Sequence, residues 1–348
     1  MKKIRALFSN YFFNLALILL FTGIVLFFTL YQNLDKVLFE LKSVSVFWIA
    51  LVIGLALSYQ IILGWILKVL VNIFNPDYSL KKGVVNALVG TLFRGITPAS
   101  GGGQVAQVYL FRKQGVKMTD SLSVLLMDFV LYQIVCVLFG LVLLLFKFNY
   151  FLDNYSAIIW LVILGWIDDS VLMFILFSLS KSPRLHKWVS SHGISILAKL
   201  RIVKDQEKTL AKLEGKLQDF QEAWKNIRQH YDQVIQVVFL NFLRLILYFA
   251  IPIFIMVALD IELSSTRAVN IFVLTAFVTM MNSLVPIPGS AGTTEAAFIY
   301  FVSNEVGYIA AVSGALIWRF ATFHLILVVG ALTFMLTKRY YLKKGVTE

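Results

Sequence analysis

Seven charged side chains lie inside stretches of sequence that are otherwise apolar, and they are the first candidates for chemistry. They are three arginines and four acids: Arg94, Asp128, Asp168, Asp169, Arg244, Glu295 and Arg319. Charges inside membrane-spanning helices are rare and cost roughly 2.5–3.5 kcal/mol each on insertion scales, so each needs a physical reason. Two interpretations stay open for each one. It either forms an ion pair that holds helices together or acts on a ligand.

Arg94 opens an interruption of one apolar run, with the sequence RGITPASGGGQ. The helix-breaking residues in it are Pro98, Gly101, Gly102 and Gly103. We predict that a helix restarts at Gln104, where unpaired N–H groups attract anions such as a phospholipid phosphate. Arg94 would add a fork of donors to the phosphate oxygens. The alternative is that the glycines only permit close helix packing.

A second apolar run is interrupted by PIPGSAGTTE, which contains Pro288, Gly289 and Gly292 and ends at Glu295. The two interruptions share the pattern P-x-S-x-G, at residues 98–102 and 288–292. Glu295 follows a break in the helix, where backbone dipoles converge, which favours a ligand-facing role for this acid. Irregular backbone at membrane depth persists only where it is buried in protein or lines a wet cavity.

Asp168 and Asp169 are adjacent acids near the middle of another apolar run. Neighbouring residues on a helix point about 100° apart, so both carboxylates cannot face one partner. We expect at least one to be protonated or to reach an arginine such as Arg244. The interpretations are a proton-coupling acid, a structural pair, or a span placed wrongly in the sequence.

The composition fixes the setting in which these residues act. Of 348 residues 59% are apolar and 14% charged, whereas soluble domains are about 25% charged. The chain is therefore expected to be an all-α integral membrane protein. Its net charge of +12 fits Lys and Arg in cytoplasmic loops, so no nucleic-acid partner is expected. With one cysteine and four scattered histidines, we expect no disulfide, no metal site and no cofactor.

About six stretches are long enough to cross a bilayer, since about 20 apolar residues are needed. The first follows Lys2, Lys3 and Arg5 and lacks a small-residue cleavage site, so we interpret it as an uncleaved span. The six predicted spans are Tyr11–Leu30, Val44–Phe74, Asp120–Phe146, Ser156–Ser180, Val234–Leu259 and Tyr308–Thr337.

Lys and Arg in the loops predict the orientation. The N-terminus, the C-terminal tail and the loops around residues 81–82, 112–117 and 181–232 are basic, which places both termini in the cytoplasm. The interrupted run Val84–Phe111 then has cytoplasmic charge on both sides, and Ala268–Val302 has outside loops on both sides. Each is predicted to enter and return as a re-entrant hairpin, from opposite faces.

The order of span, broken hairpin and span therefore occurs twice, over residues 44–146 and 234–337. This order predicts an inverted repeat, as is common in secondary transporters, within one polytopic domain covering residues 1–348. The alternative is that Ala268–Leu284 crosses the membrane alone.

Residues 181–233 form the one sizeable polar segment of the sequence. Apolar residues recur in it at steps of three and four, which indicates an amphipathic cytoplasmic helix. They are Leu210, Leu213, Leu217, Phe220, Trp224, Ile227 and Tyr231. This helix is expected to lie against the bilayer or the bundle, or else to serve for docking or dimerisation.

Two sequence motifs resemble those of a known family. They are FRGITPASGGGQVAQVYLFRKQG followed by LLMDFVLYQIV, and VPIPGSAGTTEAAFIYF followed by ALIWRFATF. With both motifs the chain resembles the lysylphosphatidylglycerol synthase transmembrane (flippase-like) family over essentially its whole length. The matching positions are Pro98, Gly102, Gly103, Gln104, Pro288, Gly289, Gly292, Glu295 and Arg319. Many members have an acid where this chain has Gln104, and Asp168-Asp169 also departs from the family pattern.

The resemblance implies a multi-pass protein of the bacterial plasma membrane that moves or handles an (amino)phospholipid, such as lysylphosphatidylglycerol, between leaflets. Arg94, Arg319 and helix N-termini would face the phosphate, while Glu295 and Asp128 would hold a basic or hydroxyl part of the headgroup. Membrane phospholipid is thus the expected partner, alongside a second copy or a separate lipid synthase.

Two alternatives remain. In full-length synthases of this family a soluble domain transfers lysine from lysyl-tRNA to phosphatidylglycerol, and the product confers resistance to cationic peptides. Here the chain ends eleven residues past Thr337, so we expect no such domain and no enzyme activity. The other alternative is a non-transporting partner of a lipid or glycan synthase.

Overall fold

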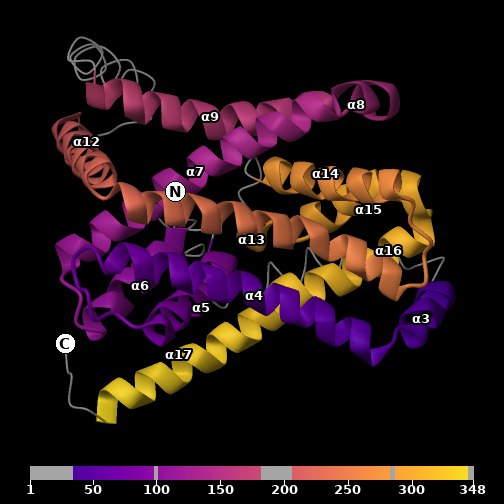
Figure 1. Cartoon of the computed structure of the whole chain (residues 1–348), viewed down its shortest axis with the longest axis horizontal. Helices are drawn as coiled ribbons and strands as arrows, with labels where there is room; N and C mark the ends of the chain where they lie inside the picture. Colours follow the sequence, from indigo (N-terminus) through magenta and orange to yellow (C-terminus); the bar gives the residue numbers. More distant parts are fainter. Residues whose placement is uncertain (1–33, 98–100, 182–205, 283–286, 344–348) are drawn as a thin grey trace.

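The computed structural model is helical throughout the part of the chain that it describes, where it contains no strand (Figure 1). It describes residues 34–97, 101–181, 206–282 and 287–343. The predicted span Tyr11–Leu30 lies outside these ranges. The all-α class expected from the composition is confirmed.

Four long helical runs form the body of the molecule and are apolar and long enough to cross a membrane. They are α4 (Val46–Val71), α7 (Met118–Phe146), α13 (Tyr231–Ala258) and the run Tyr308–Tyr341. The last run joins α16 (Tyr308–Arg319), a π-helical turn η5 (Phe320–His324) and α17 (Leu325–Lys343). These four match four of the predicted spans to within a few residues.

The predicted span Ser156–Ser180 is helical as α9 (Ile159–Lys181), of which the stretch Ile159–Asp168 is apolar among the residues with described side chains. Two further short helices, α3 (Leu34–Ser43) and α8 (Phe148–Tyr155), precede α4 and α9. The total number of spans therefore stays a prediction.

Both interrupted runs fold as helical hairpins. The first pairs α5 (Leu80–Ile96) with α6 (Gly101–Lys113), and the second pairs α14 (Ser265–Met281) with α15 (Thr293–Val306). A short 3-10 turn, η4 (Pro288–Ser290), precedes α15. Figure 1 shows the two hairpins toward opposite ends of the long helices.

One predicted boundary is wrong. The helix after the first break begins at Gly101 rather than at Gln104. The reason is a local cap, because the Gly102 N–H donates to Thr97 Oγ1 at 2.9 Å. The glycines therefore form the first turn of α6, and Gly103 packs against the backbone of α5, where an added Cβ would lie 2.9 Å from the Gly90 carbonyl oxygen.

Helices α4 and α5 cross at two glycines. A Cβ added to Gly64 would lie 2.5 Å from Val84 Cα, and one added to Gly83 would lie 2.2 Å from the Gly64 carbonyl oxygen. Such distances are shorter than any real Cβ contact, so the two backbones can approach this closely only where both residues are glycine. Small residues at crossings are typical of helix pairs in membranes. This crossing fixes α5, which carries Arg94.

The base of each hairpin is held by a tyrosine. In the first, the Tyr78 hydroxyl donates to Gln114 Oε1 at 2.6 Å, and Gln114 Nε2 donates to the Lys82 carbonyl oxygen at 3.0 Å. In the second, the Tyr150 hydroxyl of α8 donates to Glu305, the last acid of α15. Asn270 of α14 donates to the same carboxylate at 3.0 Å.

The amphipathic segment is helical as α12 (Gln206–Gln229) and packs against α7 and α9, with Ala223 and Ile227 buried in the same apolar cluster as α7. Tyr231 does not continue the apolar seam, contrary to expectation. His230 leaves the helical conformation, with φ −118° and ψ 59°, and Tyr231 begins α13.

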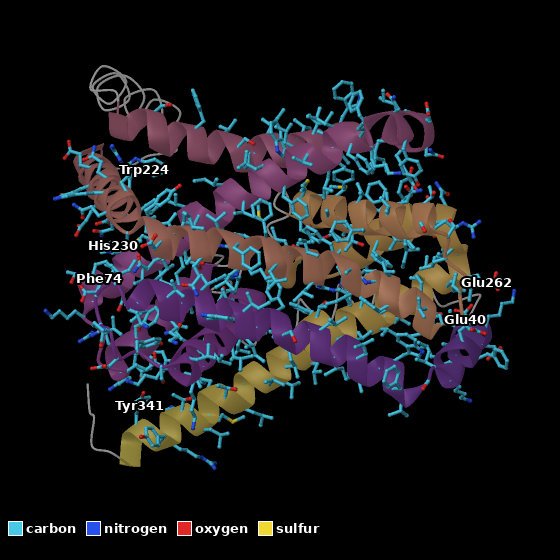
Figure 2. All side chains as sticks on the ribbon, in the orientation of Figure 1. Glu40, Phe74, Trp224, His230, Glu262 and Tyr341 are labelled. Atoms are coloured by element: carbon cyan, nitrogen blue, oxygen red, sulfur yellow. The ribbon has the colours of Figure 1, made fainter. Side chains whose placement is uncertain are left out.

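The loops predicted to lie on opposite sides of the membrane do lie at opposite ends of the long helices. Figure 2 shows Phe74, His230 and Tyr341 toward one end and Glu40 and Glu262 toward the other. Which of the two ends faces the cytoplasm stays a prediction.

The glycine crossing makes a direct prediction. Gly64→Ala should lower the thermal unfolding midpoint of the purified protein in detergent, because overpacking typically costs about 1–3 kcal/mol. Gly54→Ala on the same helix is the matched control, since nothing lies within 4 Å of its added Cβ. Its midpoint should stay or rise, because Ala favours the helix by about 0.8–1 kcal/mol. Equal unfolding midpoints for the two variants would contradict such a close approach of α4 and α5 at Gly64.

Candidate functional site

A partly open cavity of about 470 Å³ lies between the long helices and the two hairpins. Its wall includes polar residues from α4, α5 and the turn of the second hairpin. These are Tyr59, Gln60, Thr91, Arg94, Asn282 and Ser290. The cavity therefore combines residues from both interrupted runs, which are about 190 residues apart in the sequence.

The turn of the second hairpin packs against the end of the first. A Cβ added to Gly289 would lie 3.3 Å from the Gly95 carbonyl oxygen and 2.2 Å from Phe323 Cζ. Gly289 has φ +61° and Ser290 has φ +47°, both in the left-handed region. For a serine this conformation costs free energy, and such positions cluster at functional sites. The two breaks therefore meet at the cavity.

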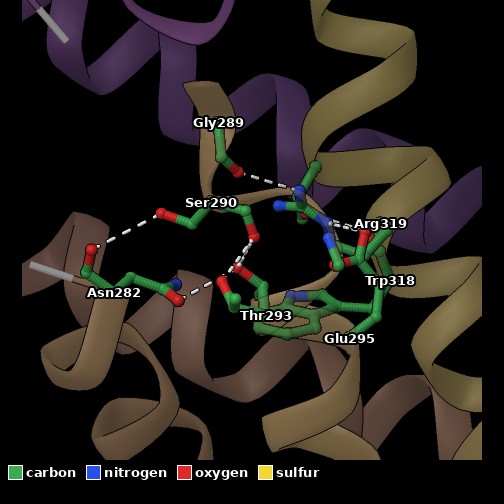
Figure 3. Close-up of polar contacts among 10 residues, drawn as sticks. Asn282, Gly289, Ser290, Thr293, Glu295, Trp318 and Arg319 are labelled. Atoms are coloured by element: carbon green, nitrogen blue, oxygen red, sulfur yellow. Dashed lines mark hydrogen bonds and ion pairs between the residues drawn. The ribbon is translucent and has the colours of Figure 1, made fainter. Parts of the chain in front are cut away.

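Short side chains hold this strained turn in place (Figure 3). The Thr294 hydroxyl lies 3.0 Å from Asn282 Oδ1 and 2.9 Å from the Ser290 carbonyl oxygen. The Thr293 hydroxyl donates to the same Ser290 oxygen at 3.0 Å. These contacts tie the end of α14 to the start of α15 across the turn.

Glu295 and Arg319 form a buried ion pair behind the turn. Arg319 Nε donates to Glu295 Oε1 at 2.8 Å, and the side chains are 7% and 3% exposed. The other oxygen, Oε2, accepts the Gly292 N–H at 2.8 Å and so caps α15. Both carboxylate oxygens are thus occupied by the protein itself.

Arg319 connects three parts of the site. Besides Glu295, it donates from its guanidinium to the Gly289 carbonyl oxygen at 3.0 Å. Its guanidinium also stacks over the Phe323 ring at 4.2 Å, in the π-helical turn η5. The last long helical run is therefore anchored to the turn through one side chain, as Figure 3 shows for its polar contacts.

Arg94 differs from Arg319 in its contacts. It is half-buried and is the one charged residue among the described residues that line the cavity. Within the described ranges it makes no hydrogen bond and no ion pair. Gly103 packs against it, since an added Cβ would lie 3.0 Å from Arg94 Cβ. The described residues around the cavity thus leave the donors of this guanidinium without a hydrogen-bond partner.

A second pair of opposite charges lies close by. Arg244 is buried and stacks over the Tyr132 ring at 4.2 Å and the Tyr59 ring at 5.6 Å. Asp128 lies within electrostatic range of Arg244 and of Arg94. In the part of the chain with described side chains, Asp128 Oδ1 and Arg244 Nε have no hydrogen-bond partner. The two charges attract each other without direct contact.

The other predicted site residues are distributed as follows. Gly101 and Gln104 are exposed at the start of α6, and Pro288 is buried beneath the second turn. Asp168 is exposed on α9 and does not pair with Arg244. Pro98 and the side chain of Asp169 lie outside what the structure describes.

Several cavity residues were missed by sequence reasoning. Gln60 and Asn282 are polar residues inside predicted apolar runs, so the rule that singled out the charges would have found them if applied to amides. Tyr248 and Thr322 carry no comparable signal, because tyrosine and threonine are common in apolar helices. Searched over its described residues, the chain has no group of His, Cys, Asp and Glu suited to a metal ion.

Comparison with known proteins gives two matches. Residues 12–330 match the family model described as the lysylphosphatidylglycerol synthase TM region. The chain is also 26% identical over 312 residues to a protein of Archaeoglobus fulgidus described as a UPF0104 membrane protein. That alignment covers 86% of this chain and 90% of the relative. No solved structure matches the chain.

The buried ion pair can be tested by a double-mutant cycle. Glu295→Gln keeps an oxygen for the Gly292 N–H but leaves Arg319 as an unpaired buried charge. Losing one partner of a buried pair costs roughly 3–5 kcal/mol, so the thermal unfolding midpoint should fall clearly. Arg319→Met should behave similarly, and the double variant should lose much less than the sum of the two.

Glu262→Gln is the matched control, because Glu262 is exposed. Its unfolding midpoint should equal that of the unchanged protein. Additive effects of Glu295→Gln and Arg319→Met would mean that the two side chains do not stabilise each other.

Proposed function

This chain belongs to the lysylphosphatidylglycerol synthase TM-region family, as its two motifs predicted, and from that premise we propose that it is a flippase-like membrane protein. In this proposal it carries a phospholipid between the two leaflets. The membrane is the plasma membrane, and both termini face the cytoplasm.

The observation that carries the proposal is Arg94, whose guanidinium has no hydrogen-bond or ion-pair partner among the described residues and lies in the wall of the cavity. A guanidinium binds phosphate oxygens through two parallel charge-assisted hydrogen bonds. Every phospholipid headgroup contains a phosphate. The acyl chains would stay in the bilayer while the headgroup occupies the cavity.

The lengths of the hairpin helices support a path for the headgroup through the protein. Helices α5 and α14 have 17 residues each, which corresponds to about 25 Å, less than the hydrocarbon thickness of about 30 Å. We propose that they are re-entrant and belong to two repeats of opposite orientation. In transporters built this way, substrates bind near the midplane at broken helices.

In this account the buried pair Glu295–Arg319 has a positioning role. It holds the turn that carries Ser290, one of the cavity residues, against the end of α5. A turn fixed by a buried ion pair keeps its donors and acceptors in place when the headgroup passes, which is how preorganised sites gain affinity.

Arg94→Gln tests the proposal. The full chain is reconstituted in phosphatidylcholine vesicles with a trace of phosphatidylglycerol labelled on one acyl chain, and leaflet exchange is followed by quenching of the outer label. A hydrogen bond to a charged group contributes about 1.5–3 kcal/mol, so the protein-dependent rate should fall about 10- to 100-fold. Arg94→Lys should retain part of it, since it keeps the charge but not the fork.

Arg112→Gln is the matched control, because Arg112 is exposed in the last turn of α6. It should exchange lipid at the unchanged rate. If Arg94→Gln also exchanges lipid at that rate while protein-free vesicles do not, Arg94 does not bind the phosphate. If the unchanged protein gives no exchange, the proposed function itself is wrong.

A further inference from the structure

We infer that the cavity selects a phosphate-ester headgroup of net negative charge, with hydroxyl groups and no ammonium. This inference rests on the proposed function and narrows its substrate class. It differs from the expectation that Glu295 and Asp128 hold a basic part of the headgroup. The charges around the cavity, and the groups that each of them already contacts, favour an anionic headgroup.

Of the seven charges found in apolar runs, Arg94 lines the cavity and four more lie behind its wall in the described part of the molecule. Together they are three arginines and two acids: Arg94, Arg244, Arg319, Asp128 and Glu295. Asp168 is exposed on α9 and does not line the cavity. The described side chains around the cavity therefore leave one positive charge uncompensated.

Glu295 is not available to an ammonium group. It is 3% exposed, with one oxygen bound to Arg319 Nε and the other to the Gly292 N–H. Drawing this carboxylate toward a ligand would leave Arg319 as an unpaired buried charge, at a cost of several kcal/mol in general. The acid that follows the second break thus serves the fold rather than a cationic headgroup.

Asp128 is opposed by two guanidinium groups. Arg244 and Arg94 both lie within its electrostatic range. An ammonium group placed beside Asp128 would therefore meet two like charges for each opposite charge. A phosphate at the same place, beside Arg94, would meet two opposite charges for each like charge.

Aromatic rings are the other means of holding an ammonium group, through cation–π contact. Two of the cavity tyrosines already serve this purpose for the protein's own cation. Arg244 lies over the rings of Tyr59 and Tyr132. The third cavity tyrosine, Tyr248, packs its ring against those of Tyr59 and Trp318.

The remaining polar wall suits hydroxyl groups. Thr91 donates its hydroxyl hydrogen to Gln60 Oε1 at 3.1 Å, and Thr322 donates to the Trp318 carbonyl oxygen at 2.7 Å. Each of these hydroxyls already donates its one hydrogen, and its oxygen can still accept a hydrogen bond. A headgroup with several O–H donors, such as a glycerol or a sugar, complements such a wall.

The test compares three lipids that differ in headgroup charge. Full-length protein in phosphatidylcholine vesicles receives acyl-labelled phosphatidylglycerol (charge −1), phosphatidylethanolamine (0) or lysylphosphatidylglycerol (+1). We expect phosphatidylglycerol to exchange on the order of tenfold faster than phosphatidylethanolamine, which corresponds to about 1.4 kcal/mol. Lysylphosphatidylglycerol should be slowest. Equal rates, or a preference for either ammonium lipid, would overturn the inference and leave the proposed function standing.

Gln60→Glu adds a negative charge to the cavity wall and hardly changes the shape of the side chain. It keeps an oxygen for the Thr91 hydroxyl and adds a negative charge to the cavity that Arg94 lines. The preference for phosphatidylglycerol should shrink toward equality. Gln229→Glu is the matched control, since Gln229 is exposed at the end of α12. An unchanged preference in a folded Gln60→Glu protein would contradict the charge argument.

One further variant and one further substrate test the remaining alternatives. Asp169→Asn should leave the preference unchanged, and a gain in preference would show that this acid belongs to the cavity charge. Radiolabelled glycerol 3-phosphate separates a lipid headgroup from a free phosphate ester of the same chemistry. We expect no uptake of it into the vesicles, and protein-dependent uptake would overturn the assignment to a lipid. If the unchanged protein exchanges none of the three lipids, it is the proposed function that fails.

Discussion

A buried guanidinium and a buried carboxylate hold the centre of this molecule together. Arg319 and Glu295 neutralise each other at 2.8 Å, while the rest of each group binds backbone at Gly289 and Gly292. Without this pair, a non-helical turn with left-handed residues would expose backbone donors and acceptors to an apolar surrounding, where each unsatisfied group costs several kcal/mol. The ion pair and the broken helix therefore depend on each other.

The position of this turn determines where the proposed path for a headgroup can lie. Because η4 packs on the end of α5, both breaks face one cavity, and helix ends from distant parts of the sequence form one wall. On the other side of the cavity, the close crossing of α4 and α5 at Gly64 and Gly83 fixes the positions of these two helices. Arg94 is the charged group that this arrangement leaves for a ligand, and it gives the cavity its proposed preference for phosphate.

Much of the fold could be predicted from the sequence, because membrane helices are specified by long apolar runs and the breaks by Pro and Gly. The helix pairs on both sides of each break followed from loop charge. The start of α6 did not, because it depends on a cap from Thr97 that has no signature in composition. The end of α12 depends likewise on the backbone at His230.

The candidate site was harder to predict than the fold. Intramembrane charge singled out Arg94, Glu295 and Arg319, but a sequence does not show which charges neutralise each other. Glu295 was expected to face a ligand, whereas its two oxygens bind Arg319 and Gly292. Pairing between residues 24 positions apart depends on how the last helical run crosses the turn. That crossing is a property of tertiary packing alone.

We propose a water-accessible cavity with net positive charge, and the thiol of Cys136 in the cavity wall is a native probe of that charge. The rate of modification of this thiol can be measured in vesicles with two water-soluble thiosulfonate reagents of equal size, one anionic and one cationic. The account predicts that the anionic reagent reacts clearly faster, and that Arg94→Gln removes the difference. Equal rates for the two reagents in the unchanged protein, or no reaction with either, would contradict it.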